Sequence, residues 1–306
     1  MAATPTPSAP SKALIFARRS ASTAFLWAIV SAVFMSRWSW AFLGLIGVLT
    51  IIATVEYFRM LRAAKVSCFP RFGMGVAMAY CGALHWFFLH GIAAHPDLEA
   101  FAIFIVLAGS FSLQLRYPIC SVQSLLAVAA NVLGFIYIAV LFNFAARLLF
   151  IIPGGNEAVG IIGEPGAFLL LWLLAVTKFT DMGAYITGSM IGRHKMIPHV
   201  SPGKTWEGFG GALLFSQLAG IGLYFAFPAE LAVFGHIGHV IALSFILALL
   251  AVVGDLAESI VKRALDAKDS GRMLPGIGGS LDLIDSICFT APAMYFYLEW
   301  LLIPNT

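Results

Sequence analysis

Charged residues are scarce in this sequence. Asp, Glu, Lys and Arg make up only 11% of its 306 residues, while 60% of the residues are hydrophobic. Soluble domains carry roughly 25% charged residues, so this chain has too few to cover a water-facing surface. The net charge of +3 is also too small to indicate a nucleic-acid partner. We therefore expect a membrane protein that binds no nucleic acid.

Cysteine and long polar segments are scarce as well. The four cysteines show no C-x-x-C spacing, so they predict neither a zinc site nor a redox pair. Residues 1–20 are rich in Pro, Ala and Ser and lack apolar periodicity. We interpret this stretch as a disordered cytoplasmic tail.

Long apolar runs recur along the rest of the chain. About twenty apolar residues are needed to cross the hydrocarbon core as a helix. By this rule the sequence predicts an all-α polytopic membrane protein with about nine transmembrane helices. The expected spans are residues 22–36, 39–57, 73–93, 99–115, 121–143, 166–188, 207–228, 238–257 and 284–302.

The basic residues predict the orientation, because cytoplasmic loops carry an excess of Lys and Arg. With a cytoplasmic N-terminus, all but three of the 18 Lys and Arg residues face the cytoplasm. The exceptions are Arg37 and Arg147 on the far side, and Lys178 within a span. We therefore expect a bacterial-type inner (cell) membrane protein whose motifs face the cytoplasm.

Unusual polar residues are concentrated in the second half of the chain. We divide the protein into an apolar transmembrane scaffold, residues 21–150, and a candidate catalytic transmembrane region, residues 151–306. In the latter, Lys178 and Asp181 lie in or at the end of one apolar run. A charge at bilayer depth costs about 2.5–3.5 kcal/mol on insertion scales. Such side chains must face a wet cavity, one another or a metal.

Residues 254–271, GDLAESIVKRALDAKDSG, place acids and a cation on one helical face. Asp255, Glu258, Ser259 and Lys262 follow the spacing i, i+3, i+4, i+7, so they project from the same side of a helix. This face presents a carboxylate pair one turn before an ammonium group.

Residues 272–286, RMLPGIGGSLDLIDS, follow with a glycine-rich turn and two further acids. The Pro and Gly residues interrupt a helix and free backbone N–H groups to approach an anion. Asp282 and Asp285 stand at i, i+3 on the helix that follows. Two acidic helix faces beside a basic, glycine-rich loop are typical of a polyphosphate site with Mg²⁺.

A second polar cluster occupies residues 180–211 and includes Ser201, Lys204 and Thr205. Its PGKT sequence is not a P-loop, because Pro198 stands where the motif needs Gly and no strand precedes it. Less specific interpretations stay open. Lys178 and Asp181 suit a simple i, i+3 ion pair, and the acidic cluster suits an ion pathway in a transporter.

These motifs together resemble the signature of the phosphatidate cytidylyltransferase family. That signature contains Ser-x-x-Lys-Arg, then Lys-Asp, a Pro-Gly-His-Gly-Gly turn and Asp-Arg-x-Asp. The matching positions are Ser259, Lys262, Arg263, Lys268, Asp269, Pro275, Gly276, Gly278, Gly279, Asp282 and Asp285. The stretches DMGAY and SPGKTWEGFGG also resemble the family's second conserved block.

The resemblance implies an enzyme that transfers CMP from CTP to phosphatidic acid, giving CDP-diacylglycerol and pyrophosphate. It implies Mg²⁺ as cofactor, with Asp255 and Asp282 as metal ligands, and suggests a homodimer. The neighbouring acids Asp285, Glu258 and Asp269 are further candidates for metal ligands. The expected catalytic residues are Lys204, Lys262, Arg263, Lys268, Asp269 and Asp285. The expected substrate-binding residues are Ser201, Thr205, Ser259, Gly278 and Gly279.

Two positions depart from the family signature. Ile277 stands where the signature has His, and Leu283 where it has Arg. We expect both to be tolerated, because every acid of the motif is retained around them. The alternatives are a related CTP-dependent membrane lipid transferase, or a non-catalytic lipid-binding or transporter-like paralogue.

Overall fold

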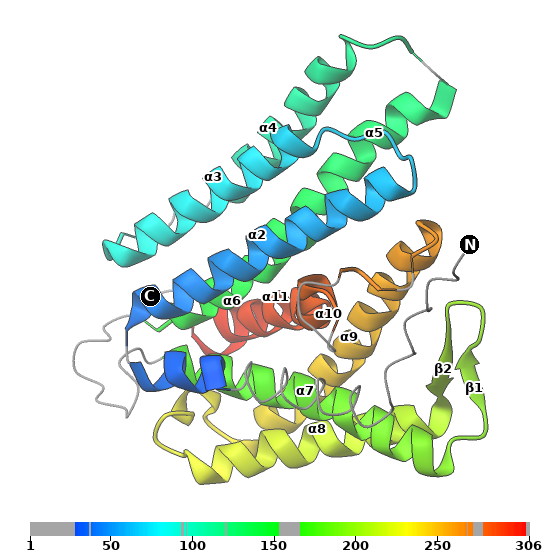
Figure 1. The fold of residues 1–306 in the computed structure, drawn as a ribbon. Coiled ribbons are helices and arrows are strands. Elements are labelled where there is room, and N and C mark those ends of the chain that lie inside the picture. Colours follow the sequence, from blue (N-terminus) through cyan, green and yellow to red (C-terminus); the bar gives the residue numbers. More distant parts are fainter. Residues whose placement is uncertain are drawn as a thin grey trace, which may run out of the picture.

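The computed structural model describes residues 28–36, 38–92, 95, 97–119, 121–152, 166–267, 269–271 and 278–303. The expected tail, residues 1–20, lies outside these ranges, as do Lys268 and Ile277. Residues 28–36 are helical, and the remaining elements make a helical bundle with one small hairpin (Figure 1).

The helices of this bundle follow the apolar runs of the sequence. They are α2 (Ser39–Ala63), α3 (Pro70–Leu89), α4 (Leu98–Gln114), α5 (Ser121–Gly134), α6 (Leu141–Leu149), α7 (Gly166–Ile191), α8 (Trp206–Ala226), α9 (Ile237–Ala264), α10 (Ser280–Ile284) and α11 (Ile287–Tyr297), with the short segments η1 (Phe135–Val140), η2 (Ala232–Phe234) and η3 (Leu298–Leu302). The strands β1 (Lys195–Ile197) and β2 (Ser201–Thr205) pair antiparallel between α7 and α8.

Six helices of the described residues are long and apolar enough to cross a membrane. They are α2, α3, the continuous helix Val122–Leu149, α7, α8 and α9. This confirms the prediction of an all-α membrane protein. The expected span 99–115 corresponds to α4, which has 17 residues. The count of nine spans stays a prediction.

Two expected spans differ in detail from the structure. The span expected at 238–257 continues as α9 to Ala264, so the acids and the lysine of residues 254–262 lie on one unbroken helix. The span expected at 284–302 is broken between α10 and α11, at residues 285–286. The break places Asp285 at the end of a short helix instead of within a long one.

The chain is arranged so that α10 and α11 lie in the middle of the bundle (Figure 1). In this view α2, α3, α4 and α5 lie on one side of them, and α7 and α8 lie on the other. Helix α11 contacts α6, α7 and α9, while α10 contacts α2 and α9. The short helix α10, which carries Asp282, is therefore surrounded by longer apolar helices.

Helices α7 and α8 pack closely through small residues. Because neither Gly183 nor Gly211 has a side chain, the two backbones can approach each other. A Cβ atom on Gly211 would meet the Thr187 hydroxyl and lie 2.7 Å from the Gly183 carbonyl oxygen. Further along the same two helices, the Trp172 indole donates a hydrogen bond of 3.0 Å to the Gly220 carbonyl. Small residues at such positions are a common basis of helix packing in membranes.

We predict that Gly211→Ala destabilises the protein, whereas Gly210→Ala does not. Both residues lie in the interior of α8, but a Cβ on Gly210 has nothing within 4 Å. Overpacking typically costs about 1–3 kcal/mol. Thermal unfolding in detergent should show a lower midpoint for Gly211→Ala alone. Equal midpoints for the two variants would contradict this packing.

Candidate active site

A polar cavity of about 590 Å³ lies among α7, α8, α9, α10 and the hairpin. It brings together most of the residues that the sequence predicts. These are Ser201, Lys204, Thr205, Asp255, Lys262, Asp269, Asp282 and Asp285. Glu258, a further metal-ligand candidate, lines the cavity too. Thr180, Asp181 and Ser286 also line it, although the sequence did not predict them as substrate or metal residues.

The other predicted residues lie outside the cavity wall. Arg263 is exposed on α9, and Ser259 is half-buried on the same helix. Gly278 and Gly279 form the turn before α10 and contact Asp282 instead of the cavity. Lys268 lies outside the described residues.

Three carboxylates form the most compact acidic group of the described residues. One oxygen each from Asp255, Glu258 and Asp285 lies within 4.8 Å of the others. Glu258 is 2% exposed and Asp285 6%, and the Glu258 Oε1 atom has no hydrogen-bond partner within the described part of the chain. Buried carboxylates this close repel one another unless a cation or proton lies between them. Three hard oxygen donors and an unpaired oxygen fit a divalent cation such as Mg²⁺.

Asp282 lies beside this trio and is already well supplied with donors. Its Oδ1 atom accepts a hydrogen bond of 2.8 Å from the Lys262 ammonium, which also donates to Glu258 at 2.6 Å. Its Oδ2 atom accepts from the Ser270 hydroxyl at 2.7 Å and from the Gly279 N–H at 2.6 Å. The expected metal pair of Asp255 and Asp282 therefore stays a prediction, while the geometry groups Asp255 with Glu258 and Asp285.

The charge state of Asp282 follows from these contacts, and α10 lies outside the six candidate spans. Burial raises the pKa of Asp282. Its contact with the Lys262 ammonium and the hydrogen bonds from the Gly279 N–H and the Ser270 hydroxyl outweigh burial and lower the pKa to about 2. Asp282 is thus ionised at neutral pH and holds Lys262 at the cavity wall.

The turn before α10 is shaped by two glycines and by an acid from the first half of the chain. Gly278 has φ of +121°, a conformation that favours glycine. Glu56 of α2 is 1% exposed and accepts a hydrogen bond of 3.0 Å from the Leu281 N–H. A Cβ atom on Gly279 would lie 2.6 Å from the Glu56 Oε2 atom. The sequence analysis placed Glu56 in the apolar scaffold. A lone acid in an apolar run is a signal that could have indicated a buried polar contact.

The hairpin supplies the third wall of the cavity. Lys204 of β2 lies 2.9 Å from the Asp255 carboxylate and donates to the Val252 carbonyl at 3.3 Å. The Thr205 hydroxyl accepts a hydrogen bond of 3.1 Å from the Gly208 N–H and so caps α8. Glu207, in the first turn of α8, binds the backbone N–H of Arg193 at 3.1 Å. These contacts anchor the hairpin at the start of α8.

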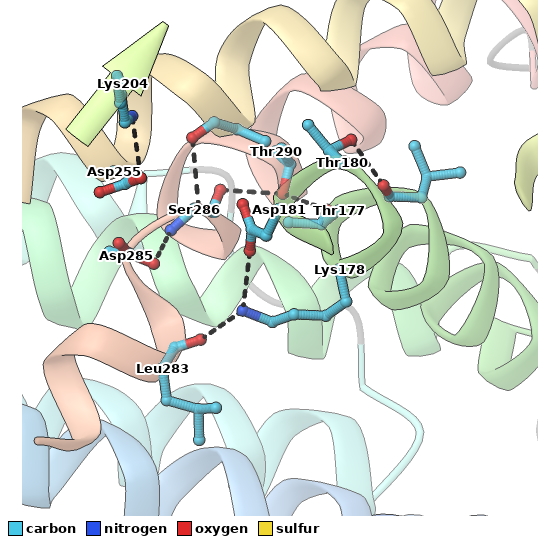
Figure 2. Close-up of polar contacts among 12 residues, drawn as sticks. Thr177, Lys178, Thr180, Asp181, Lys204, Asp255, Leu283, Asp285, Ser286 and Thr290 are labelled. Carbon is cyan, nitrogen blue, oxygen red and sulfur yellow. Dashed lines mark hydrogen bonds and ion pairs between the residues drawn. The ribbon is translucent and has the colours of Figure 1, made fainter. Parts of the chain in front are cut away.

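Lys178 approaches the same region from α7 (Figure 2). Its ammonium lies 3.4 Å from the Asp181 carboxylate and donates to the Leu283 carbonyl at 3.2 Å. The i, i+3 ion pair that the sequence left open is therefore present. Figure 2 also shows Ser286, directly before α11, and Thr290 of α11 beside α7. The hydroxyls of Thr177 and Thr290 are hydrogen-bonded at 3.2 Å.

Comparison with known proteins identifies the family. A model described as the cytidylyltransferase family matches residues 17–301. The chain belongs to the cytidylyltransferase family. The resemblance seen in the sequence motifs is thereby confirmed, and it extends well beyond residues 180–290, where those motifs are dense.

Three relatives illustrate the similarity. The chain is 34% identical over 204 residues to the uncharacterized protein YnbB of Escherichia coli (strain K12), covering 66% of this chain and 64% of that one. It is 42% identical over 132 residues to a phosphatidate cytidylyltransferase of Staphylococcus haemolyticus (strain JCSC1435), covering 43% and 47%. It is 36% identical over 233 residues to a phosphatidate cytidylyltransferase of Helicobacter pylori (strain J99), covering 71% and 84%.

We predict that the carboxylate trio binds a divalent cation. Mn²⁺ titration of the purified protein, followed by electron paramagnetic resonance, should show a bound ion. Glu258→Gln and Asp285→Asn should each weaken binding by about tenfold or more, since losing an outer-shell partner alone costs that much. Asp266→Asn is the control, because Asp266 is exposed and its positive φ of 51° suits Asn. Equal affinity in all variants would exclude the trio.

Proposed function

We propose that this protein transfers CMP from CTP to phosphatidic acid, giving CDP-diacylglycerol and pyrophosphate in phospholipid biosynthesis. One observation carries the proposal: in a membrane protein of the cytidylyltransferase family, a single polar cavity joins the carboxylate trio to Lys204 and Lys262. The names of the staphylococcal and Helicobacter relatives support the choice of substrates. The aligned regions span 64% of YnbB and 47% of the staphylococcal relative.

The reaction needs positioning and charge neutralisation more than a covalent nucleophile. A phosphate oxygen of phosphatidic acid attacks the α-phosphorus of CTP, and the bond to the leaving pyrophosphate breaks. The negative charge of the triphosphate must be offset throughout, as in other phosphoryl-type transfers. Lys204 and Lys262 lie where they can offset it, and Ser201 lines the same cavity as a hydrogen-bond donor.

The carboxylates would hold the cofactor in this scheme. Asp255, Glu258 and Asp285 are the proposed ligands of Mg²⁺, which when bound would neutralise phosphate oxygens. Asp282 would keep Lys262 in place and stay available as a further ligand. Lys204 now pairs with Asp255, so its ammonium would turn from the carboxylate to the triphosphate when CTP enters. Ser259, Arg263, Lys268 and Asp269 stay proposed substrate contacts.

We predict that purified protein consumes CTP in the presence of phosphatidic acid and Mg²⁺ and releases pyrophosphate. Asp255→Asn and Asp282→Asn should each lower kcat by about 10²–10³, the loss seen when one preorganised electrostatic group is removed. Folded protein should still be recovered in detergent. Asp266→Asn serves as the control that keeps full turnover. Wild-type protein without CTP consumption would refute the proposal.

The two departures from the family signature are tested with the same assay. We expect wild-type turnover despite Ile277 and Leu283, because the trio, Lys204 and Lys262 are all present at the cavity. Turnover that appears only in the Ile277→His, Leu283→Arg double variant would favour a non-catalytic lipid-binding paralogue. Turnover with another membrane alcohol or lipid phosphate, but not with phosphatidic acid, would favour a related transferase.

We also propose that the N-terminus and the cavity face the cytoplasm of a bacterial-type inner membrane, where CTP is found. The distribution of basic residues supports this orientation. A homodimer remains the proposed assembly on family analogy alone.

The orientation predicts opposite labelling at the two ends of α8. In a cysteine-free background, His199→Cys in the hairpin should react with an impermeant maleimide only after the cells are opened. Ala229→Cys, in the turn that follows α8, should react in intact cells. Both positions are exposed, so reactivity reports the side of the membrane. Labelling of the hairpin cysteine in intact cells would overturn the orientation.

A further inference from the structure

A second cavity adjoins the polar one at Asp282, which lines both. Its volume is about 390 Å³, and it is lined by residues 30–34, α2, α6, α7, α10 and α11. Its walls consist mainly of aliphatic and aromatic side chains, and among the described residues Lys178 and Asp282 are the only charged ones in its lining. Most of the wall belongs to helices that are long and apolar enough to cross a membrane. An apolar cavity lined by such helices suits a hydrocarbon chain better than any water-soluble group.

The two cavities meet at a wall made of a few polar residues. Asp282 lines both cavities. Lys178 lines the apolar cavity, while its ion-pair partner Asp181 lines the polar one. The Lys178 side chain is 30% exposed, so its ammonium is reachable by a ligand at this boundary. The stripe Leu171, Leu174 and Lys178 on α7 therefore leads from hydrocarbon surroundings to a cation.

Lys178 also brings positive charge to the place where the sequence departs from the family signature. Residue 283 is Leu instead of the Arg of Asp-Arg-x-Asp. The Lys178 ammonium donates to the backbone carbonyl of that same residue at 3.2 Å (Figure 2). A cation thus lies beside position 283, although it is carried by α7. Leu283 itself adds to the apolar wall.

We propose that Lys178 binds the phosphate group of the lipid substrate while one acyl chain occupies the apolar cavity, an inference that rests on the proposed function. An ammonium with three N–H donors can exchange the 3.4 Å contact with Asp181 for a phosphate oxygen. The phosphate then lies at the boundary with the polar cavity, close to Asp282 and Lys262. CTP is water-soluble and has no hydrocarbon chain to bury against the apolar wall, so the site selects an amphiphile.

The first test separates the two substrates kinetically. Lys178→Met keeps the length of the side chain and removes its charge. It should raise KM for phosphatidic acid about tenfold or more, the loss expected for a charge-assisted hydrogen bond, and leave KM for CTP within about twofold. Lys178→Arg should keep most activity, and Lys65→Met, at an exposed loop position, should change neither value. Equal rises in both KM values, or none, would overturn the proposal.

The second test moves the cation. Adding Leu283→Arg to Lys178→Met should lower KM for phosphatidic acid back toward the wild-type value, because an arginine at 283 would supply charge at the same boundary. Thermal unfolding of each variant shows whether it is folded. A folded double variant with no recovery would overturn the assignment of the cation to this place.

The third test needs no turnover. A phosphatidic acid with a diazirine on one acyl chain should crosslink to α2 and α7, and unlabelled phosphatidic acid should compete better than diacylglycerol or inorganic phosphate. Leu174→Trp fills the apolar cavity and should reduce labelling, whereas Leu218→Trp, 59% exposed on α8, should not. Labelling only of lipid-exposed helix surfaces would overturn the site. Normal labelling without CTP consumption would instead refute the proposed function.

Discussion

Lys262 joins two carboxylates that come from different helices, and the polar cavity depends on this contact. Glu258 stands one turn before Lys262 on α9, while Asp282 reaches the same ammonium from α10. Leaving a buried charge without its partner destabilises a protein by about 3–5 kcal/mol. The position of α10 against α9 therefore depends on this charge pairing. The turn containing Gly278 and Gly279 leads directly into α10, and the Gly279 N–H binds the same Asp282 carboxylate. Asp285, one turn further on, is carried toward Asp255 by the same placement.

Charge pairing recurs at other positions in the described part of the chain. Lys204 pairs with Asp255 across the hairpin, and Lys178 pairs with Asp181 on α7. In the first half of the chain Arg147 pairs with Glu99, and Tyr80 donates to the same carboxylate at 3.0 Å. The first two pairs line the cavities and the third does not. An ion pair alone thus does not indicate a functional site. An ion pair that lines a cavity next to a carboxylate oxygen without a partner, such as Glu258 Oε1, does.

Much of this arrangement could be predicted from the sequence, because its causes are local. Apolar length placed α3, α7 and α8 within a few residues of their ends, and helical spacing placed Glu258 and Lys262 on one face. The features that depend on residues far apart in the sequence could not be predicted. Spacing cannot tell that Asp285 joins Asp255 and Glu258 while Asp282 binds Lys262, since that depends on the break between α10 and α11. Nor could it connect Glu56 with a turn 225 residues away.

The separation between Glu56 and Leu281 has a consequence for biosynthesis. Chains are made at about 5–20 residues per second, so roughly 10–45 seconds pass between the synthesis of the acid and that of the backbone N–H that binds it. During this interval α2 must be held in the membrane with its carboxylate unmatched. Helix α2 and the turn before α10 are thus parts of one folding unit, and a ribosome-bound chain that stops before α10 lacks the N–H group that binds this carboxylate.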